Sequence, residues 1–212
     1  MQQNNTKHLL VIAAKLLVIC TIVAVIIAFV NAITKDKITI NQLNNTAEAL
    51  TGIYGKEYGD NTFSVVRNEN GAASFVMKDE NNVVLLTCQA AECEKLPDIT
   101  DVYVIKNAIG EITNYCVFAS PMGFKDKINM LVAINPALTV KSVKIVSLSD
   151  TSGIGTKVQE ESFLTQFVDK SSVIGEVDTI SGATKSSKPV INAVNTALEQ
   201  TALYISTQGG NK

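Results

Sequence analysis

One long apolar stretch near the start of the chain sets the first limit on how this sequence can fold. Leu9–Ile33 is apolar over its 25 residues, apart from Lys15, Cys20, Thr21 and Asn31. As a helix rising ~1.5 Å per residue it would extend roughly 37 Å, which exceeds a membrane's hydrocarbon core of about 30 Å. Lys15 lies close enough to the start for its ammonium to reach the headgroup region. The stretch therefore predicts a single transmembrane anchor.

A cleavable signal peptide is the rival interpretation of the same stretch. Val30-Asn31-Ala32 resembles a small-x-small cleavage site, but the apolar run is longer than the usual signal core of about 7–15 residues. Both interpretations put the rest of the chain outside the cytoplasm, and we expect a cytoplasmic N-terminus. We assign residues 1–37 to this N-terminus and anchor, and residues 38–212 to one domain. A pilin-type filament subunit is disfavoured, because its Gly-Phe processing junction and nearby glutamate are missing.

The rest of the chain has the composition of a mildly acidic globular domain. Acidic residues outnumber basic ones over the whole chain, 20 to 18, and four of the lysines lie in residues 1–37. This balance argues against nucleic acid as a partner. The single histidine, His8, precedes the apolar stretch. Residues 38–212 therefore lack the proton shuttle of Ser-His-Asp or Cys-His hydrolases and the ligands of imidazole zinc sites. We expect no catalytic side chain and no metal site.

The cysteine spacing gives no metal or redox motif. Cys88 and Cys93 have four residues between them, which is not the C-x-x-C pattern. A disulfide between them would require an oxidising compartment, and both the bridged and the thiol state remain open. Structural roles are favoured for these two and for Cys20 and Cys116.

Hydrophobic periodicity predicts an α+β domain with strands in the middle and helices towards the ends. The expected helices are Asn41–Tyr54, Glu160–Val168 and Pro189–Ile205, with Pro189 near the first turn of the last. The expected strands are short and alternate with turn residues: Phe63–Arg67, Ala73–Met77, Val83–Thr87, Val102–Lys106, Ile112–Ser120, Asn129–Ile134 and Thr139–Ser147.

Two polar loops stand apart from this scaffold. The first, Asp150–Lys157, reads Asp-Thr-Ser-Gly-Ile-Gly-Thr-Lys and lies between a strand and a helix. Gly153 and Gly155, together with small hydroxyl residues, would allow backbone to approach a ligand closely. The loop matches neither a P-loop nor a G-x-G-x-x-G fingerprint. By itself it is equally typical of an ordinary strand-to-helix turn.

The second loop, Asp178–Thr184, runs directly into the last helix. The start of a helix offers unpaired N–H groups and the positive end of the helix dipole, which favour a phosphate. Gly182 and Ala183 leave the Thr184 hydroxyl uncrowded, so another protein could reach it. The alternative is a helix cap rich in serine and threonine that binds no ligand.

The second loop resembles a known motif. Asp178, Ser181, Gly182, Ala183 and Thr184 match the D-x-x-S-G-A-T flavinylation motif of extracytoplasmic FMN-binding domains. In that family a flavin transferase of the ApbE type joins FMN to the last threonine through a phosphoester. The resemblance implies that Thr184 carries covalent FMN. The phosphodiester would be an anion, and Lys185, which stands where the family often has an apolar residue, would lie near it.

Two further segments are similar to the same family. Asp150–Lys157 resembles its E-T-P-G-L-G stretch, with Asp150 in place of glutamate and Ser152 in place of proline; Gly123–Ile128 resembles its G-Y-G-G-x-I segment. The resemblance implies that the first loop contacts the flavin through Gly153, Gly155, Thr156 and Lys157.

Over essentially its full length, the chain resembles the G subunits of Rnf ion-translocating ferredoxin:NAD oxidoreductases. The resemblance implies a single-pass subunit of the inner membrane whose extracytoplasmic FMN-binding domain has a mainly antiparallel sheet with flanking helices. It would transfer electrons between neighbouring redox subunits and have no independent activity. Alternatives are the C subunit of a sodium-translocating NADH:quinone oxidoreductase, a stand-alone flavin-bearing reductase, and a non-redox anchored binding or filament module.

Overall fold

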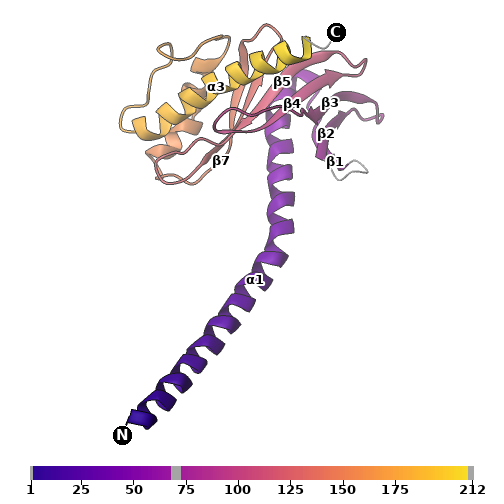
Figure 1. Cartoon of the computed structure of the whole chain (residues 1–212). Helices are drawn as coiled ribbons and strands as arrows, with labels where there is room; N and C mark the ends of the chain where they lie inside the picture. The colour runs from indigo at the N-terminus through magenta and orange to yellow at the C-terminus, as the bar shows by residue number, and fades with distance from the viewer. Residues whose placement is uncertain (1, 68–72, 210–212) are drawn as a thin grey trace. The chain divides into compact units, whose positions relative to one another are not determined.

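The computed structural model describes residues 2–67 and 73–209 (Figure 1). The side chains of residues 2–11, 36 and 209 are not described, so His8 lies outside the described side chains. The chain divides into two compact units, Met1–Leu43 and Asn44–Lys212. The sequence-based boundary between residues 37 and 38 stays a prediction.

The first helix, α1 (Gln2–Tyr54), is 53 residues long. Its large apolar side chains from Ile12 to Ile33 are exposed, and by length and composition it is able to cross a membrane. Within it, the Thr21 hydroxyl donates to the carbonyl of Leu17 at 2.8 Å, which satisfies this polar group inside the apolar stretch. The prediction of a separate helix beginning at Asn41 is wrong, because these residues belong to α1. Residues 2–51 contain neither glycine nor proline, so nothing interrupts the helix between the apolar stretch and the domain.

The domain is built on a seven-stranded sheet in which every strand pairs antiparallel with its neighbours in sequence. The strands are β1 (Phe63–Arg67), β2 (Ala73–Lys78), β3 (Val84–Ala90), β4 (Ile99–Asn107), β5 (Ile112–Ala119), β6 (Ile128–Ile134) and β7 (Val140–Leu148). These elements confirm the predicted α+β class and antiparallel sheet. All seven predicted strands are present, and β4 begins three residues earlier than the periodicity indicated.

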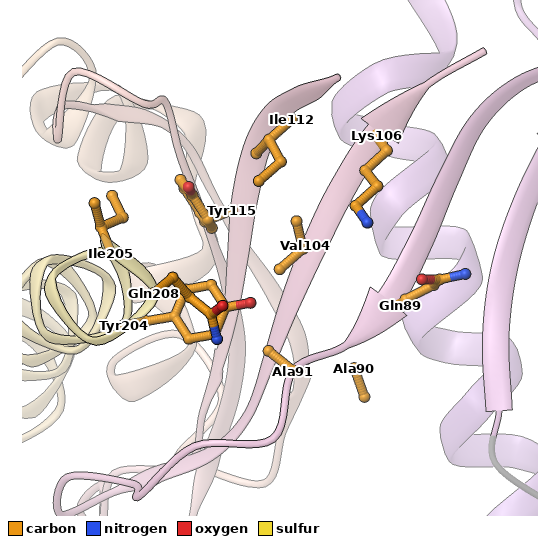
Figure 2. A pocket seen from close by; sticks show the side chains of 10 residues that line it. All are labelled: Gln89, Ala90, Ala91, Val104, Lys106, Ile112, Tyr115, Tyr204, Ile205 and Gln208. Atoms are coloured by element: carbon orange, nitrogen blue, oxygen red, sulfur yellow. The ribbon is translucent and has the colours of Figure 1, made fainter. Parts of the chain in front are cut away.

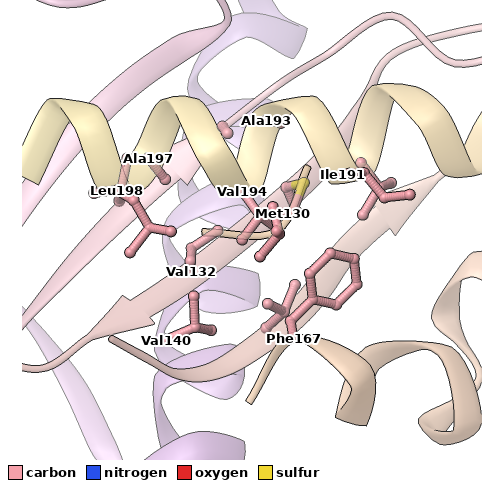
Figure 3. Packing of buried hydrophobic residues seen from close by; sticks show 14 of the residues in the cluster. Met130, Val132, Val140, Phe167, Ile191, Ala193, Val194, Ala197 and Leu198 are labelled. Atoms are coloured by element: carbon pink, nitrogen blue, oxygen red, sulfur yellow. The ribbon is translucent and has the colours of Figure 1, made fainter. Parts of the chain in front are cut away.

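The last helix, α3 (Thr184–Gly209), covers one face of the sheet (Figures 1 and 3). Its apolar residues at three- and four-residue spacing face inward. Figure 3 shows them above side chains from β6 and β7 and above Phe167. The buried cluster on this face includes Met130, Val132, Val140, Phe167, Val190, Ile191, Val194, Ala197 and Leu198.

The end of α1, within the second unit, packs on the opposite face of the sheet. Successive side chains of a strand point to opposite faces, and β5 shows this directly. Tyr115 contacts the Tyr204 ring of α3 with centroids 5.9 Å apart, whereas the next residue, Cys116, lies 3.5 Å from the Tyr54 hydroxyl at the end of α1. A short 3₁₀ helix, η1 (Gly55–Tyr58), then leads into β1.

All four cysteines are free thiols. The sequence left a disulfide between Cys88 and Cys93 open, and the fold places these two residues on opposite sides of the sheet. Cys88 is fully buried and lies, like Cys116, on the α1 side of the sheet. Cys93 follows β3 and lies 3.8 Å from the Gln200 amide of α3 on the other side. Burial raises the pKa of Cys116 to about 12, so this thiol stays protonated and unreactive at neutral pH.

Short helical segments connect β7 to α3. They are η2 (Gly155–Gln159), α2 (Glu161–Leu164) and η3 (Thr165–Phe167), so the helix expected over Glu160–Val168 is α-helical only in its first turn. The last helix starts at Thr184, earlier than expected, and Pro189 lies inside it rather than at its first turn. Proline cannot donate to the carbonyl four residues earlier, but the buried Val190, Val194 and Leu198 that follow hold the helix against the sheet.

Gln200 ties the segment before β4 to α3. Its side chain is fully buried; its Oε1 accepts from the Leu96 N–H at 2.7 Å and its Nε2 donates to the Glu94 carbonyl at 2.9 Å. One buried amide thus satisfies two backbone groups of a segment that has no secondary structure of its own.

We expect Gln200→Ala to destabilise the domain by about 1–3 kcal/mol for each buried backbone group left without a partner. Urea denaturation followed by circular dichroism measures the loss. Glu199→Ala is the matched control, because the neighbouring Glu199 is exposed and, within the described part of the chain, its side chain accepts a hydrogen bond from Asn195 alone, at 2.7 Å. Equal unfolding midpoints for the two variants would contradict a stabilising role for the Gln200 hydrogen bonds.

Candidate functional site

The two polar loops and the loop before β6 meet at one pocket of about 420 Å³. Residues from the three segments line it: Phe124; Asp150, Thr151, Ile154 and Gly155; and Gly182, Ala183, Thr184, Lys185 and Ser186. The segments are far apart in sequence, and each leaves or enters an element of the sheet-and-helix scaffold. The fold therefore brings together the segments whose motifs resemble one family.

The Asp150 carboxylate holds these three segments together. Its Oδ2 accepts from the Ser186 hydroxyl of α3 at 2.6 Å and from the Phe124 N–H at 3.4 Å. Its Oδ1 accepts from the Thr151 N–H at 2.6 Å. Hydrogen bonds to an ionised carboxylate are stronger than those between neutral groups. Asp150 thus fixes the position of the first turn of α3 relative to both loops.

Gly155 makes room for this carboxylate. A Cβ atom on Gly155 would lie 2.3 Å from the Asp150 Cγ and 2.6 Å from each of its oxygens, closer than atoms can approach. The glycine is required by this contact, and its role is to let the backbone of η2 pass against Asp150.

The hydrogen bonds also lower the pKa of the Asp150 carboxyl. Partial burial raises the pKa of its carboxyl, but the bonds from Ser186, Thr151 and Phe124 and the charge of Lys125 outweigh burial and lower the pKa below its usual value. The ionised form is therefore the one that the folded state favours.

A tight turn presents Thr184. The Ala183 N–H donates to the Ile180 carbonyl at 2.9 Å, and Gly182, third in this turn, has φ of +79°, as a type II turn requires. The buried Ser187 hydroxyl accepts from the Ile180 N–H at 3.3 Å and donates to the Ala183 carbonyl at 3.0 Å. Thr184 then begins α3 with its side chain exposed.

The mouth of the pocket carries large apolar side chains and one cation. Phe124 and Ile154 are 55% and 51% exposed, although both are apolar. The Lys185 Nζ lies over the Phe124 ring, 5.2 Å from its centroid, a geometry that attracts a cation to an aromatic face.

Five of the residues predicted for the site do not line the pocket: Asp178, Ser181, Gly153, Thr156 and Lys157. Some of them shape the loops instead. The Thr156 hydroxyl accepts from the Gly153 N–H at 2.9 Å, and the Asp178 N–H donates to Gln166 Oε1 at 3.1 Å. Gly155, Gly182, Ala183, Thr184 and Lys185 do line the pocket; that these residues bind a cofactor stays a prediction.

Sequence reasoning missed Ser186, Ile154 and the central role of Asp150. A signal for Ser186 was present, because Ser186 and Ser187 fall on the stripe of α3 that continues through the buried Val190 and Val194. A hydroxyl on a buried stripe needs a polar partner, and Asp150 supplies it.

A second pocket lies near the other end of α3 (Figure 2). Its volume is about 290 Å³, and its lining includes Tyr115, Tyr204 and Lys106. It contains none of the motif residues. The described residues contain no group of three or more His, Cys, Asp or Glu placed to hold a metal ion.

We expect Gly155→Ala to displace Asp150 and to lower the stability of the domain by about 1–3 kcal/mol, the usual cost of overpacking. Urea denaturation measures this loss. The control is Gly52→Ala, where the added Cβ would meet only Lys144 at an ordinary distance of 3.6 Å and alanine favours the helix. A stable Gly155→Ala variant would show that the carboxylate can move freely.

The lowered pKa of Asp150 predicts a pH-dependent contribution to stability. Because the folded-state pKa lies below the unfolded value of about 3.9, the contribution is complete above that value and is lost as pH falls through the folded pKa. Asp150→Asn should therefore be less stable than wild type at pH 7, and the gap should narrow towards pH 3. Urea midpoints at both pH values test this, with the exposed Asp178→Asn as control. A stability difference between wild type and Asp150→Asn that stays the same at both pH values would contradict the lowered pKa of Asp150.

Residues 123–199 match the family of FMN-binding domains. Over 98% of its length the chain is 25% identical to the whole of the G subunit of an ion-translocating oxidoreductase complex from Methanosarcina acetivorans. It is also 33% identical over 100 residues to the G subunit of a proton-translocating ferredoxin:NAD(+) oxidoreductase complex from Clostridium ljungdahlii; this match covers 42% of the chain and 54% of that protein.

A solved structure, NqrC of Shewanella oneidensis, aligns with 46% of this chain and 54% of its own at a TM-score of 0.39 and 22% identity. The family match begins in the loop that carries Phe124 and ends within α3, so it encloses all three segments of the pocket. Residues 123–199 thus match the FMN-binding domain family, and the chain as a whole is similar to the M. acetivorans protein.

Proposed function

We propose that this chain carries FMN joined by a phosphoester to Thr184 and acts as an electron-transfer subunit of a membrane-bound, ion-translocating ferredoxin:NAD oxidoreductase. The observation that carries the proposal is the setting of Thr184. It ends the D-x-x-S-G-A-T motif, its side chain is exposed, and it borders a pocket inside the matched FMN-binding domain.

The residues around Thr184 fit a tethered flavin phosphate. Among the described residues, the N–H groups of Thr184 and Lys185 have no hydrogen-bond partner, whereas those of Ser186 and Ser187 bond to the Ala183 carbonyl at 3.0 and 2.9 Å. Free N–H groups and the positive end of the α3 dipole favour a phosphodiester at this position. The small Gly182 and Ala183 leave the approach to the hydroxyl open.

When bound, the flavin supplies the redox chemistry, accepting and releasing electrons that no side chain of the chain carries. The chain's own residues bind and orient. The Thr184 Oγ1 would attack the FMN phosphorus of a flavin dinucleotide held by a flavin transferase of the ApbE type. The pyrophosphate P–O bond would break, the nucleoside monophosphate would leave, and the hydroxyl hydrogen would depart as a proton. Asp150 and Ser186 would keep the first turn of α3 fixed against the other two loops, so that the tether has one orientation.

The remaining parts of the proposal concern location and partners. The exposed apolar side chains of α1 support a single-pass anchor in the cell membrane, with a cytoplasmic N-terminus and the FMN-binding domain on the outer side. The full-length similarity to a complex subunit supports other membrane and redox subunits as its partners. A covalent tether suits this location, because a flavin bound only by contacts would be lost to the exterior.

Thr184→Ala should abolish covalent flavin while leaving the domain folded, because the exposed Thr184 side chain forms no core contact. The chain is produced together with a flavin transferase and analysed by intact and peptide mass spectrometry. Wild type should gain the mass of FMN minus water on the peptide that contains Thr184. Thr179→Ala, an equally exposed threonine of the same loop, is the matched control and should be loaded like wild type.

Two outcomes would overturn the assignment. One is a wild-type chain without the added mass, alongside a control substrate that the same transferase loads. The other is flavin retained by Thr184→Ala through denaturing electrophoresis, which would put the bond on another residue.

A further inference from the structure

Three side chains from three segments surround the pocket beside Thr184: Phe124 before β6, Ile154 after β7 and Lys185 in the first turn of α3. We propose that Phe124 and Ile154 flank the flavin ring and that the Lys185 ammonium, held over Phe124, stabilises the negative charge that the ring gains on reduction. The inference rests on the proposed attachment of FMN to Thr184, and it assigns the residues that set the potential of the flavin.

The exposure of Phe124 and Ile154 argues for a ligand between them. Both are more than half exposed, yet both line the pocket next to the attachment residue. Among the described residues, four pairs of aromatic rings contact each other edge to face, and Phe124 belongs to none of them. A planar aromatic ligand would remove the two apolar surfaces from water and give Phe124 a stacking partner.

Lys185 provides a positive charge that no acid in the described residues neutralises. The ion pairs there are Lys95–Asp101, Lys141–Glu57 and Lys170–Glu176, and Lys185 belongs to none of them. The acid of the pocket, Asp150, is engaged by Ser186, Thr151 and Phe124. The contact with the Phe124 ring keeps the ammonium at the pocket rather than extended into solvent.

The position of this charge bears on the redox equilibrium. A flavin ring that takes up two electrons and one proton gains one negative charge. A nearby cation favours that form over the neutral oxidised form, because their Coulomb attraction is weakly screened beside apolar groups. Lys185 should therefore raise the midpoint potential. The tether phosphodiester would be held by the N–H groups at the start of α3, which leaves the ammonium for the ring.

The test is the midpoint potential of the full-length chain after loading by the transferase, titrated with dithionite and followed by flavin absorbance. Lys185→Met should shift the midpoint to a more negative value, and Lys185→Arg, which keeps the charge, should restore it. Lys188→Met is the matched control, because Lys188 is exposed one turn further along α3 and does not line the pocket. Its midpoint should equal that of wild type.

Phe124→Ala is a second, independent variant, because it leaves Lys185 and the attachment motif in place. Losing the ring under the ammonium should also lower the midpoint. Unchanged midpoints for Lys185→Met and Phe124→Ala, with covalent flavin present by mass, would overturn this inference and leave the proposed function intact. A wild-type chain without covalent flavin would overturn both, so the two failures are distinguishable.

Discussion

The hydrogen bonds of one carboxylate hold the candidate site together. Asp150 follows β7, yet it binds the first turn of α3 through Ser186 and the loop before β6 through the Phe124 N–H. Through these bonds a single side chain connects the three segments that line the pocket. The contact depends in turn on Gly155, which alone leaves room for the carboxylate. The core of α3 on the sheet supplies the rigid base from which this arrangement is built (Figure 3). Binding residues are placed most accurately when such a scaffold supports them.

Much of the scaffold could be predicted from the sequence, because its elements are short, periodic and bounded by turn residues. The seven strands and the last helix follow from apolar spacing alone. The errors have physical causes. The end of α1 was predicted as a separate helix, although no breaker precedes it, and α3 starts before Pro189 because packing of its apolar stripe outweighs the lost hydrogen bond. The order of the strands and the faces that the two helices cover are tertiary facts that periodicity does not contain.

The candidate site was predictable in part. The motif ending at Thr184 and the glycine-rich loop were both visible as segments, and the structure brings Gly155 and Thr184 to one pocket. The hydrogen bond that joins these two segments could not be predicted from the sequence. Asp150 was visible only as a substitution within a motif, and its bond to Ser186 spans 36 positions. Phe124 and Ile154 lie in segments that resemble the family's motifs, but the sequence did not single them out as site residues, and their exposure at the pocket is what the structure adds.

The order of the strands in the sheet also bears on how the domain can assemble. Each strand pairs only with its neighbours along the chain, so hairpins can form one after another as the chain emerges, with small loop-closure costs. The helix that covers one face of the sheet comes last, and the turn before Thr184 is held by Ser187 of that same helix. Thr184, the acceptor in the proposed function, would therefore be presented only after this helix has docked. A transferase that reads this turn would act on finished domains and leave incomplete chains unmodified.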